Sequence, residues 1–304
     1  MFKCPLLALL AWTVLQTAPP DTEIYLASLS TASGRVTIGA PVDISNSPGY
    51  DNQPSFTPDG RSILFTSVRG DRKPDAANSA ATGSDIYRYD IAGQQLTRVT
   101  DTPESEYSPL VTPDGAHFST IRVEADGTQR LWRFTLDGKN PDLVLVDVKP
   151  VGYHAWIDSG TLALFVLGSP ATLQIADVKS GKADVVARDI GRSIQRMPGG
   201  EISFVARQAS SAGQPPVLTI SQLTPASRAI VPLVRAPAGA TDADVAWTPE
   251  GLLLMASGGT LYGWRRGDPE MRPVADLSVL GLAGVSRIAV SPSGDRIALV
   301  ARPR

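Results

Sequence analysis

Short runs in which apolar and polar side chains alternate recur along the whole chain. In the run at 85–90 (DIYRYD), Tyr87 and Tyr89 alternate with Ile86 and Arg88. A period of two places the two sets on opposite faces of a β-strand. Related runs stand at 130–138, 172–181, 217–223 and 260–267. No long stretch has the apolar spacing of a helix, so we predict an all-β chain.

A tight-turn sequence precedes these runs and repeats six times. Its copies are FTPDG (56–60), VTPDG (111–115), WIDSG (156–160), RMPGG (196–200), WTPEG (247–251) and VSPSG (290–294). Proline presets φ early in such a turn and glycine accepts a positive φ, so each copy predicts a hairpin between two strands. The closing glycines are 55, 45, 40, 51 and 43 residues apart. Steps of this length are typical of four-stranded propeller blades.

The last copy of the alternating run stands at the start of the chain, as Glu23–Ser28 (EIYLAS). Counted from Gly294 to Arg304 and then from Pro19 to Gly60, the step is 52 residues, similar to the other five. We therefore predict one six-bladed β-propeller over residues 19–304, closed by N- and C-terminal strands together. The predicted blades are 47–101, 102–148, 149–188, 189–236, 237–280, and 281–304 plus 19–46. Their packing should bury Phe65, Phe134, Phe165, Phe204, Trp247 and Leu299.

Residues 1–18 have the layout of a secretory signal peptide. Lys3 precedes an apolar run over 5–15, and a small residue stands at Ala18. The run is too short to span a bilayer comfortably. We expect export to the periplasm; the alternatives are another cleavage point or an uncleaved segment that anchors the protein in the membrane. The single cysteine, Cys4, lies in this segment, so the mature chain forms no disulfide.

Composition and the absence of known motifs exclude several kinds of partner and site. The formal net charge is −2 and no run of like charges occurs, so nucleic acid is not an expected partner. His117 and His154 are the only histidines, too few for a zinc site without carboxylates, and Asp242-Ala243-Asp244 offers too few oxygens for calcium. The sequence contains no Gly-x-Ser-x-Gly motif and no glycine-rich phosphate loop. We expect no metal, no cofactor and no catalytic residue.

The repeated Pro-x-Phe/Trp-Ser/Thr-Pro-Asp-Gly element, followed by Asp-Ile-Tyr, resembles the repeat of TolB-type six-bladed β-propellers. The resemblance covers about residues 22–304. It is good in the first two blades, moderate in the fifth, and in outline only in the others. Proteins of the TolB type carry an additional α/β domain, and their propeller binds the peptidoglycan-associated lipoprotein across the channel mouth. We expect a propeller without that domain here, so the resemblance implies a fold and a compartment more than a partner.

The residues just before each first strand are expected to ring one mouth of the central channel. Asp51, Glu106 and Asp242 each stand three residues before the equivalent position of their blade. Mixed charges and aromatic rings around a concave mouth suit a polar ligand or a peptide. The candidate ligand-binding residues are Asp51, Glu106, Tyr107, Tyr153, His154, Arg192, Asp242 and Arg287.

A structural role is the alternative for several of these residues. Asp51 and Asp242 would then only accept hydrogen bonds that tie neighbouring blades, since aspartate favours such local bonding. His154 would be a packed or hydrogen-bonded imidazole, and His117 a solvent-facing residue.

Two functions from different classes fit these features. The first is a monomeric, non-catalytic periplasmic propeller that binds an envelope protein or a cell-envelope polymer at the channel mouth. The alternative is a small-molecule hydrolase or lyase that uses the channel-mouth carboxylates, although the sequence fixes no acid–base pair. The long polar loop at 68–83 is expected to be a mobile surface loop. The alternative is a second binding surface, because long loops without secondary structure are either functional or disordered.

Overall fold

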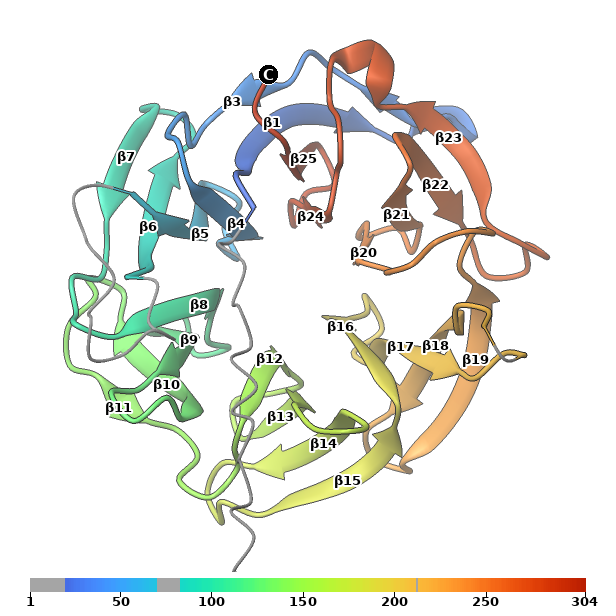
Figure 1. Cartoon of the computed structure of the whole chain (residues 1–304). Helices are drawn as coiled ribbons and strands as arrows, with labels where there is room; N and C mark the ends of the chain where they lie inside the picture. The colour runs from blue at the N-terminus through green and yellow to red at the C-terminus, as the bar shows by residue number, and fades with distance from the viewer. Residues whose placement is uncertain (1–19, 70–82, 212) are drawn as a thin grey trace, which may run out of the picture.

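The computed structural model describes residues 20–69, 83–211 and 213–304. These residues form six antiparallel sheets arranged as blades around a central axis (Figure 1). The predicted fold class, a six-bladed β-propeller, is therefore confirmed. The predicted signal segment at 1–18 lies outside the described residues, as does nearly all of the predicted loop at 68–83.

Five blades follow one another along the chain, each with four strands in order from the channel outward. Blade one contains β4 (Tyr50–Phe56), β5 (Ser62–Val68), β6 (Asp85–Asp90) and β7 (Gln95–Arg98). Blade two contains β8 (Ser105–Val111), β9 (His117–Val123), β10 (Gln129–Thr135) and β11 (Asp142–Leu143). Blade three contains β12 (Val151–Trp156), β13 (Thr161–Val166), β14 (Thr172–Asp177) and β15 (Ala183–Arg188). Blade four contains β16 (Ile190–Arg196), β17 (Ile202–Gln208), β18 (Val217–Thr224) and β19 (Ala229–Arg235). Blade five contains β20 (Val245–Trp247), β21 (Leu253–Ser257), β22 (Thr260–Trp264) and β23 (Arg272–Asp276).

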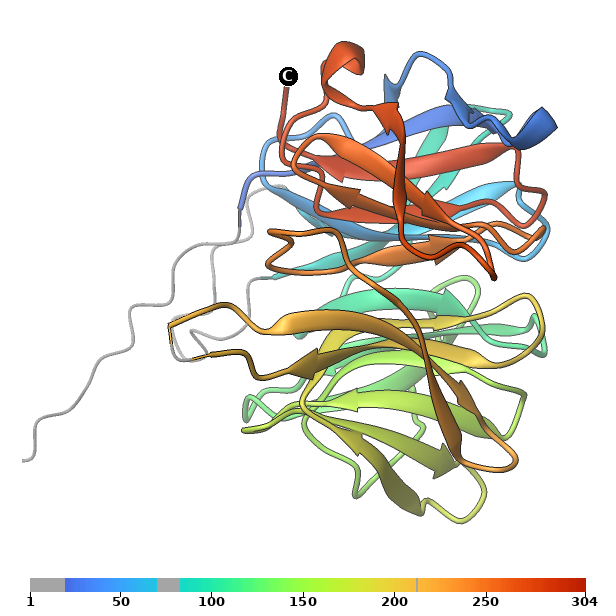
Figure 2. The ribbon, with the colours of Figure 1, turned by 90° about the vertical axis from the view of Figure 1, so that its right-hand side faces the viewer.

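Blade six closes the ring with both ends of the chain. Its inner strands are β24 (Arg287–Val290) and β25 (Arg296–Ala301), and β25 pairs with β1 (Glu23–Ser30) from Glu23↔Ala301 to Ser28↔Arg296. The outer edge is split, because β2 (Thr37–Ile38) and β3 (Val42–Asp43) each pair with β1. The blue N-terminal strand and the red C-terminal strands share one blade in both views (Figures 1 and 2). Closure by N- and C-terminal strands is thus confirmed.

The repeated turns behave as their sequences predict in five of six copies. Gly60, Gly115, Gly200, Gly251 and Gly294 have φ between 68° and 94°, the left-handed region that glycine accepts without strain. The exception is Gly160, which has no positive φ; its N–H instead donates to the Asp158 carboxylate (2.9 Å).

The core lies between blades, where side chains of neighbouring sheets interdigitate. Phe65, Phe134, Phe165, Phe204 and Leu299 are buried, as expected. Trp247 is only half-buried, and its indole N–H donates to Ser203 Oγ of the preceding blade (2.8 Å). Trp156 makes the same contact with Ser119 (2.8 Å), so this hydrogen bond is a recurring tie between blades.

The inner strands of the first two blades each carry a bulge. The register shifts between Asn52 and Ser55 in β4, and between Tyr107 and Leu110 in β8. The residues that absorb the extra length, Gln53 and Ser108, have φ of 57° and 55°. Such bulges redirect side chains near the end of a strand, and here they decide which residues face the channel.

Candidate functional site

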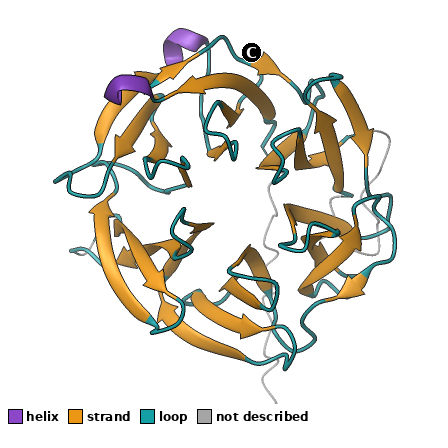
Figure 3. Ribbon diagram, turned by 180° about the vertical axis from the view of Figure 1, so that it is seen from behind, coloured by secondary structure: helices purple, strands orange, loops and turns teal. Residues whose placement is uncertain are grey.

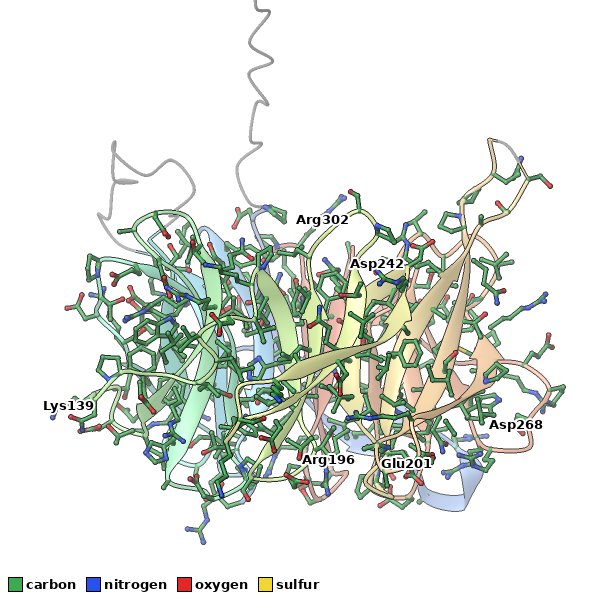
Figure 4. All side chains as sticks on the ribbon, turned by 90° about the horizontal axis from the view of Figure 1, so that it is seen from below. Lys139, Arg196, Glu201, Asp242, Asp268 and Arg302 are labelled. Carbon is green, nitrogen blue, oxygen red and sulfur yellow. The ribbon has the colours of Figure 1, made fainter. Side chains whose placement is uncertain are left out.

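A cavity of about 970 Å³ occupies the centre of the ring. Its wall consists mainly of the inner strands of blades one to four, which surround the axis in the view from behind (Figure 3). Turn residues form one end of the cavity, among them Pro58, Asp114 and Asp158. We call the side of the disc that carries these turns the turn face. Arg196 lines this end of the cavity, and it lies on the face opposite to Asp242 and Arg302 (Figure 4).

The other end of the cavity is crossed by a contact between opposite blades. Arg287 begins β24 in blade six and Tyr153 lies on β12 in blade three, half a ring away (Figure 1). The Arg287 Nη2 donates to the Tyr153 hydroxyl (2.7 Å), and its guanidinium carbon lies 4.9 Å from the centre of the Tyr153 ring. The two side chains therefore span the channel by a hydrogen bond and a cation–π contact.

Charged residues of the neighbouring blades surround this contact. Asp244, which is 9% exposed, accepts from Arg287 Nη1 (3.1 Å) and from the backbone N–H of Ile288 (3.3 Å). Burial raises the pKa of the Asp244 carboxyl, and the Arg287 charge opposes that rise. Arg192 on β16 pairs with Asp242 (2.7 Å) on the side away from the turns. We call Tyr153, Arg192, Asp244 and Arg287 together the channel floor.

His154 lies beside the floor in the wall of blade three. It is 4% exposed, and its Nε2 lies 2.7 Å from the Ser119 hydroxyl. Burial lowers the pKa of His154 to about 3, so the imidazole is neutral at physiological pH. Ser119 also accepts a hydrogen bond from the Trp156 indole, and Ser203 and Trp247 make the same contact between blades four and five without a histidine. The Ser119–His154 pair is therefore not by itself a nucleophile and its base.

The structure divides the eight predicted site residues into two groups. Tyr153, His154, Arg192 and Arg287 line the cavity. Asp242 lies beyond the floor, where it is joined to the cavity only through Arg192. Tyr107 packs into the core between blades two and three.

Asp51 and Glu106 are fully buried between blades and do not line the cavity. Asp51 accepts from Arg69 Nη2 (2.7 Å), and the Arg69 guanidinium carbon lies 4.8 Å from the Tyr87 ring centre. Glu106 accepts from Arg122 Nε (3.1 Å) in the equivalent place of blade two. Asp51 and Glu106 are therefore buried partners of arginines in their own blades and do not lie at an open mouth.

The bulges explain why counting residues along the sequence assigns the wrong residue of blade five as the counterpart of Asp51 and Glu106. Glu106 lies opposite Arg122 and Asp51 opposite Ser67, whereas blade five has no extra residue and pairs Val245 with Met255. Continuing that register makes Ala243 the counterpart of Asp51 and Glu106, and brings Asp244 to the level of Tyr107. The alignment of the blades by sequence was therefore off by one residue in blade five.

Two residues near the floor were missed from the sequence. Asp244 was weighed only as a calcium ligand, although it directly precedes the first strand of its blade. Tyr50 is the other: burial raises the pKa of its phenol well above the usual range, and the positive charges of Arg287 and Arg192 oppose that rise. In the sequence, Tyr50 is a single aromatic residue two places before Asn52, and no pattern there predicts that it lies near the channel floor.

The remaining expectations concern His117, metal binding and membrane-spanning helices. His117 is partly exposed and its Nδ1 lies 3.3 Å from Asp114 in the same turn. Within the described ranges, no group of three or more His, Cys, Asp or Glu side chains is placed to hold a metal ion. Among the described residues, no helix has the length and apolar character needed to cross a membrane.

Comparison with known proteins supports the fold. No protein-family model matches the chain. A structure described as TolB from Agrobacterium tumefaciens is 15% identical, with a TM-score of 0.65 over 93% of this chain and 99% of that chain. TolB from Acinetobacter baumannii is 14% identical, with a TM-score of 0.54 over 93% of this chain and 65% of that chain. An oligogalacturonate lyase in complex with manganese is 13% identical, with a TM-score of 0.58 over 94% of this chain and 92% of that chain.

At these identities the likeness concerns the fold alone. The predicted resemblance to TolB-type six-bladed propellers is confirmed at that level, by the six blades and by the TolB structures they match. Structures described as TolB and as a lyase both stand among the matched propellers, so the shared fold does not assign a function.

Proposed function

We propose that this protein is a non-catalytic propeller of the periplasm that binds a protein segment or a cell-envelope polymer in its central channel. The observation that carries the proposal is the cavity of about 970 Å³, which is open among the turns and crossed by the Arg287–Tyr153 contact at its other end. Binding sites are typically concave, largely preformed, and lined by apolar surface with a few convergent polar groups.

The cavity wall has this composition. Phe56, Leu110, Trp156 and Ile194 supply apolar surface along the inner strands, and the channel floor supplies the charges. Because residues from all six blades contribute, the ligand would be held by residues far apart in the sequence on rigid strands. The ligand would approach from the turn face, where Arg196 and Asp158 stand exposed at the rim.

The compartment and the oligomeric state belong to the same proposal. The layout of residues 1–18 favours export, and the TolB likeness of the fold agrees with a place in the envelope. We propose that the exported chain works as a monomer, since its blade-six edge is already closed by its own N-terminal strand.

Capture from an envelope extract tests the binding proposal. We expect the exported protein, immobilised as bait, to retain an envelope component, and Arg196→Glu at the rim to reduce its affinity on the order of tenfold. Arg88→Glu is the matched control, because Arg88 is an exposed arginine on β6 outside the cavity. Equal losses in both variants would indicate non-specific charge attraction, and capture of nothing by the folded wild type would reject the proposal.

The second candidate is a small-molecule hydrolase or lyase that uses carboxylates of the channel. The likeness to an oligogalacturonate lyase favours it, as does Asp244 on the channel floor. Asp51 and Glu106 give it no support, since both are buried away from the cavity. Incubating the protein with oligogalacturonate and following the ultraviolet absorbance of an unsaturated product would decide for this candidate.

A further inference from the structure

Unpartnered polar atoms gather around the cavity. Across the described residues, four buried side-chain polar atoms have no hydrogen-bond partner in the protein, and three belong to residues that line the cavity: Ser108 Oγ, His154 Nδ1 and Arg192 Nε. They come from blades two, three and four, which are neighbours in the ring. A buried polar atom without a partner is costly, so three around one cavity point to a ligand that supplies the missing partners.

Two of these three atoms carry a hydrogen to donate, and the third can donate or accept. Ser119 Oγ accepts from Trp156 Nε1, and the same oxygen lies 2.7 Å from His154 Nε2 and 3.2 Å from the Leu110 carbonyl oxygen. The shorter distance favours donation of the Ser119 hydrogen to His154. His154 Nε2 is then the acceptor, and the single proton of the neutral imidazole lies on the unpartnered Nδ1. Arg192 Nε always carries hydrogen, and the Ser108 hydroxyl donates or accepts.

The floor adds charge to this arrangement. Arg287 already binds Asp244 and Tyr153, and Arg192 binds Asp242 through Nη2 while its Nε has no partner. Two guanidinium groups face two carboxylates, so the site is formally neutral without a ligand. A ligand with one negative charge leaves an excess of one charge, and a ligand with a double negative charge leaves an excess of two. A single carboxylate with further acceptor oxygens fits better, because arginine binds carboxylates with favourable geometry.

We infer that the cavity binds a small organic carboxylate, or the carboxylate end of a longer chain. Its charged group lies at the channel floor against Arg192 and Arg287, and further acceptor oxygens of the ligand face Ser108 and His154. This inference rests on the proposed function, because it names the chemical group that the channel receives. The group can belong to a peptide terminus or to a sugar acid.

Calorimetric titration with matched probes tests the inference. The peptide pair is N-acetyl-trialanine and its C-terminal amide, and the sugar pair is glucuronate and glucose. We expect at least one acid to bind, and its neutral partner to bind at least tenfold more weakly. The pair that shows the difference identifies the source of the carboxylate. Equal binding of acid and neutral partner, or no binding of either acid, would overturn the inference.

Variants test which side chain binds the carboxylate of the ligand. Arg192→Met should weaken binding of the acid by about ten- to a hundredfold, since a charge-assisted hydrogen bond is lost. Arg207→Met is the control: Arg207 is on β17 of the same blade, its side chain is 38% exposed against 34% for Arg192, and it pairs with Asp189 outside the cavity. Equal weakening in both variants, with unchanged melting curves, contradicts the assignment to the floor.

Capture from the envelope separates the two proposals. If the wild-type protein retains an envelope component but binds neither acid, the carboxylate inference fails and the binding function stands. If it binds an acid but retains no envelope component, the cavity binds a small molecule and the proposed partner is wrong.

Discussion

Deletion of residues 20–46 is expected to leave a chain that does not fold into a stable monomer. The deletion removes β1, which pairs with β25 over six residues, and with it the buried side chains of Ile24, Tyr25 and Leu29. Burial of each such side chain contributes about 1.5–3 kcal/mol, so the loss approaches the whole stability of about 5–15 kcal/mol typical of a domain. It also exposes the edge of β25, which favours aggregation.

A circular permutant provides the control for this deletion. It joins residue 304 to residue 20 by a flexible linker and opens the chain in the exposed turn at 125–127, so that every strand is retained. We expect the permutant to elute as a monomer and to melt cooperatively, whereas the deleted chain aggregates. A deleted chain that stays monomeric with the wild-type melting curve would contradict closure of the ring by the N-terminal strand.

Arg122→Met is expected to cost about 3–5 kcal/mol of unfolding free energy at pH 8, because it leaves a buried carboxylate without its counter-ion. Glu106 is fully buried and accepts from Arg122 Nε (3.1 Å). The Arg122 guanidinium carbon also lies 4.9 Å from the ring centre of Trp132, so the methionine keeps part of the apolar contact. The double variant Glu106→Gln/Arg122→Met should recover much of the loss.

The cost of Arg122→Met should depend on pH. Burial raises the pKa of Glu106 to about 7, against 4.5 for the free side chain, so below pH 7 the folded protein holds this carboxyl protonated. At pH 5 the cost should therefore shrink, since no buried anion is left alone. In the wild type, the Glu106 contribution to stability is present below pH 4.5 and is lost as the pH rises through 7, by on the order of 3 kcal/mol.

Denaturant unfolding of the wild type, Glu106→Gln and Arg122→Met at pH 5 and pH 8 measures these differences. Glu106→Gln should remove this component of the pH dependence while it keeps the size of the side chain. A cost of Arg122→Met that is the same at both pH values would show that Glu106 does not titrate in this range, and would contradict the raised pKa of this carboxyl.

The fold was predictable because its signals are local and repeated. Each Pro-Asp-Gly turn specifies a hairpin through the φ preferences of two residues, and the spacing of six turns implies six blades. The run at Glu23–Ser28 matches the third strand of the other blades closely enough that the sequence alone places it in the last blade, where it pairs with β25. Only the splitting of the last outer strand into β2 and β3 had no counterpart in the pattern.

The site was less predictable because it depends on register and on contacts across the channel. One bulge residue in each of the first two blades shifts the count, which separates Asp242 from Asp51 and brings Asp244 to the floor. The contact between Arg287 and Tyr153 joins residues 134 positions apart in opposite blades, and no spacing rule connects them. Burial of Asp51 and Glu106 likewise follows from packing against the preceding blade, which a single sequence does not show.

Entry of a ligand into the channel from the turn face is tested best by blocking one face at a time. Protein that starts at residue 19 has no cysteine, so Ser159→Cys or Thr241→Cys accepts a bulky maleimide at one site only. Ser159 is exposed in a turn that lines the cavity, and Thr241 is exposed next to Asp242, which lies on the opposite face. Capture of the envelope component is then compared before and after labelling. We predict that the label at position 159 abolishes capture and that the label at position 241 leaves it unchanged; loss of capture only with the label at 241 would contradict entry from the turn face.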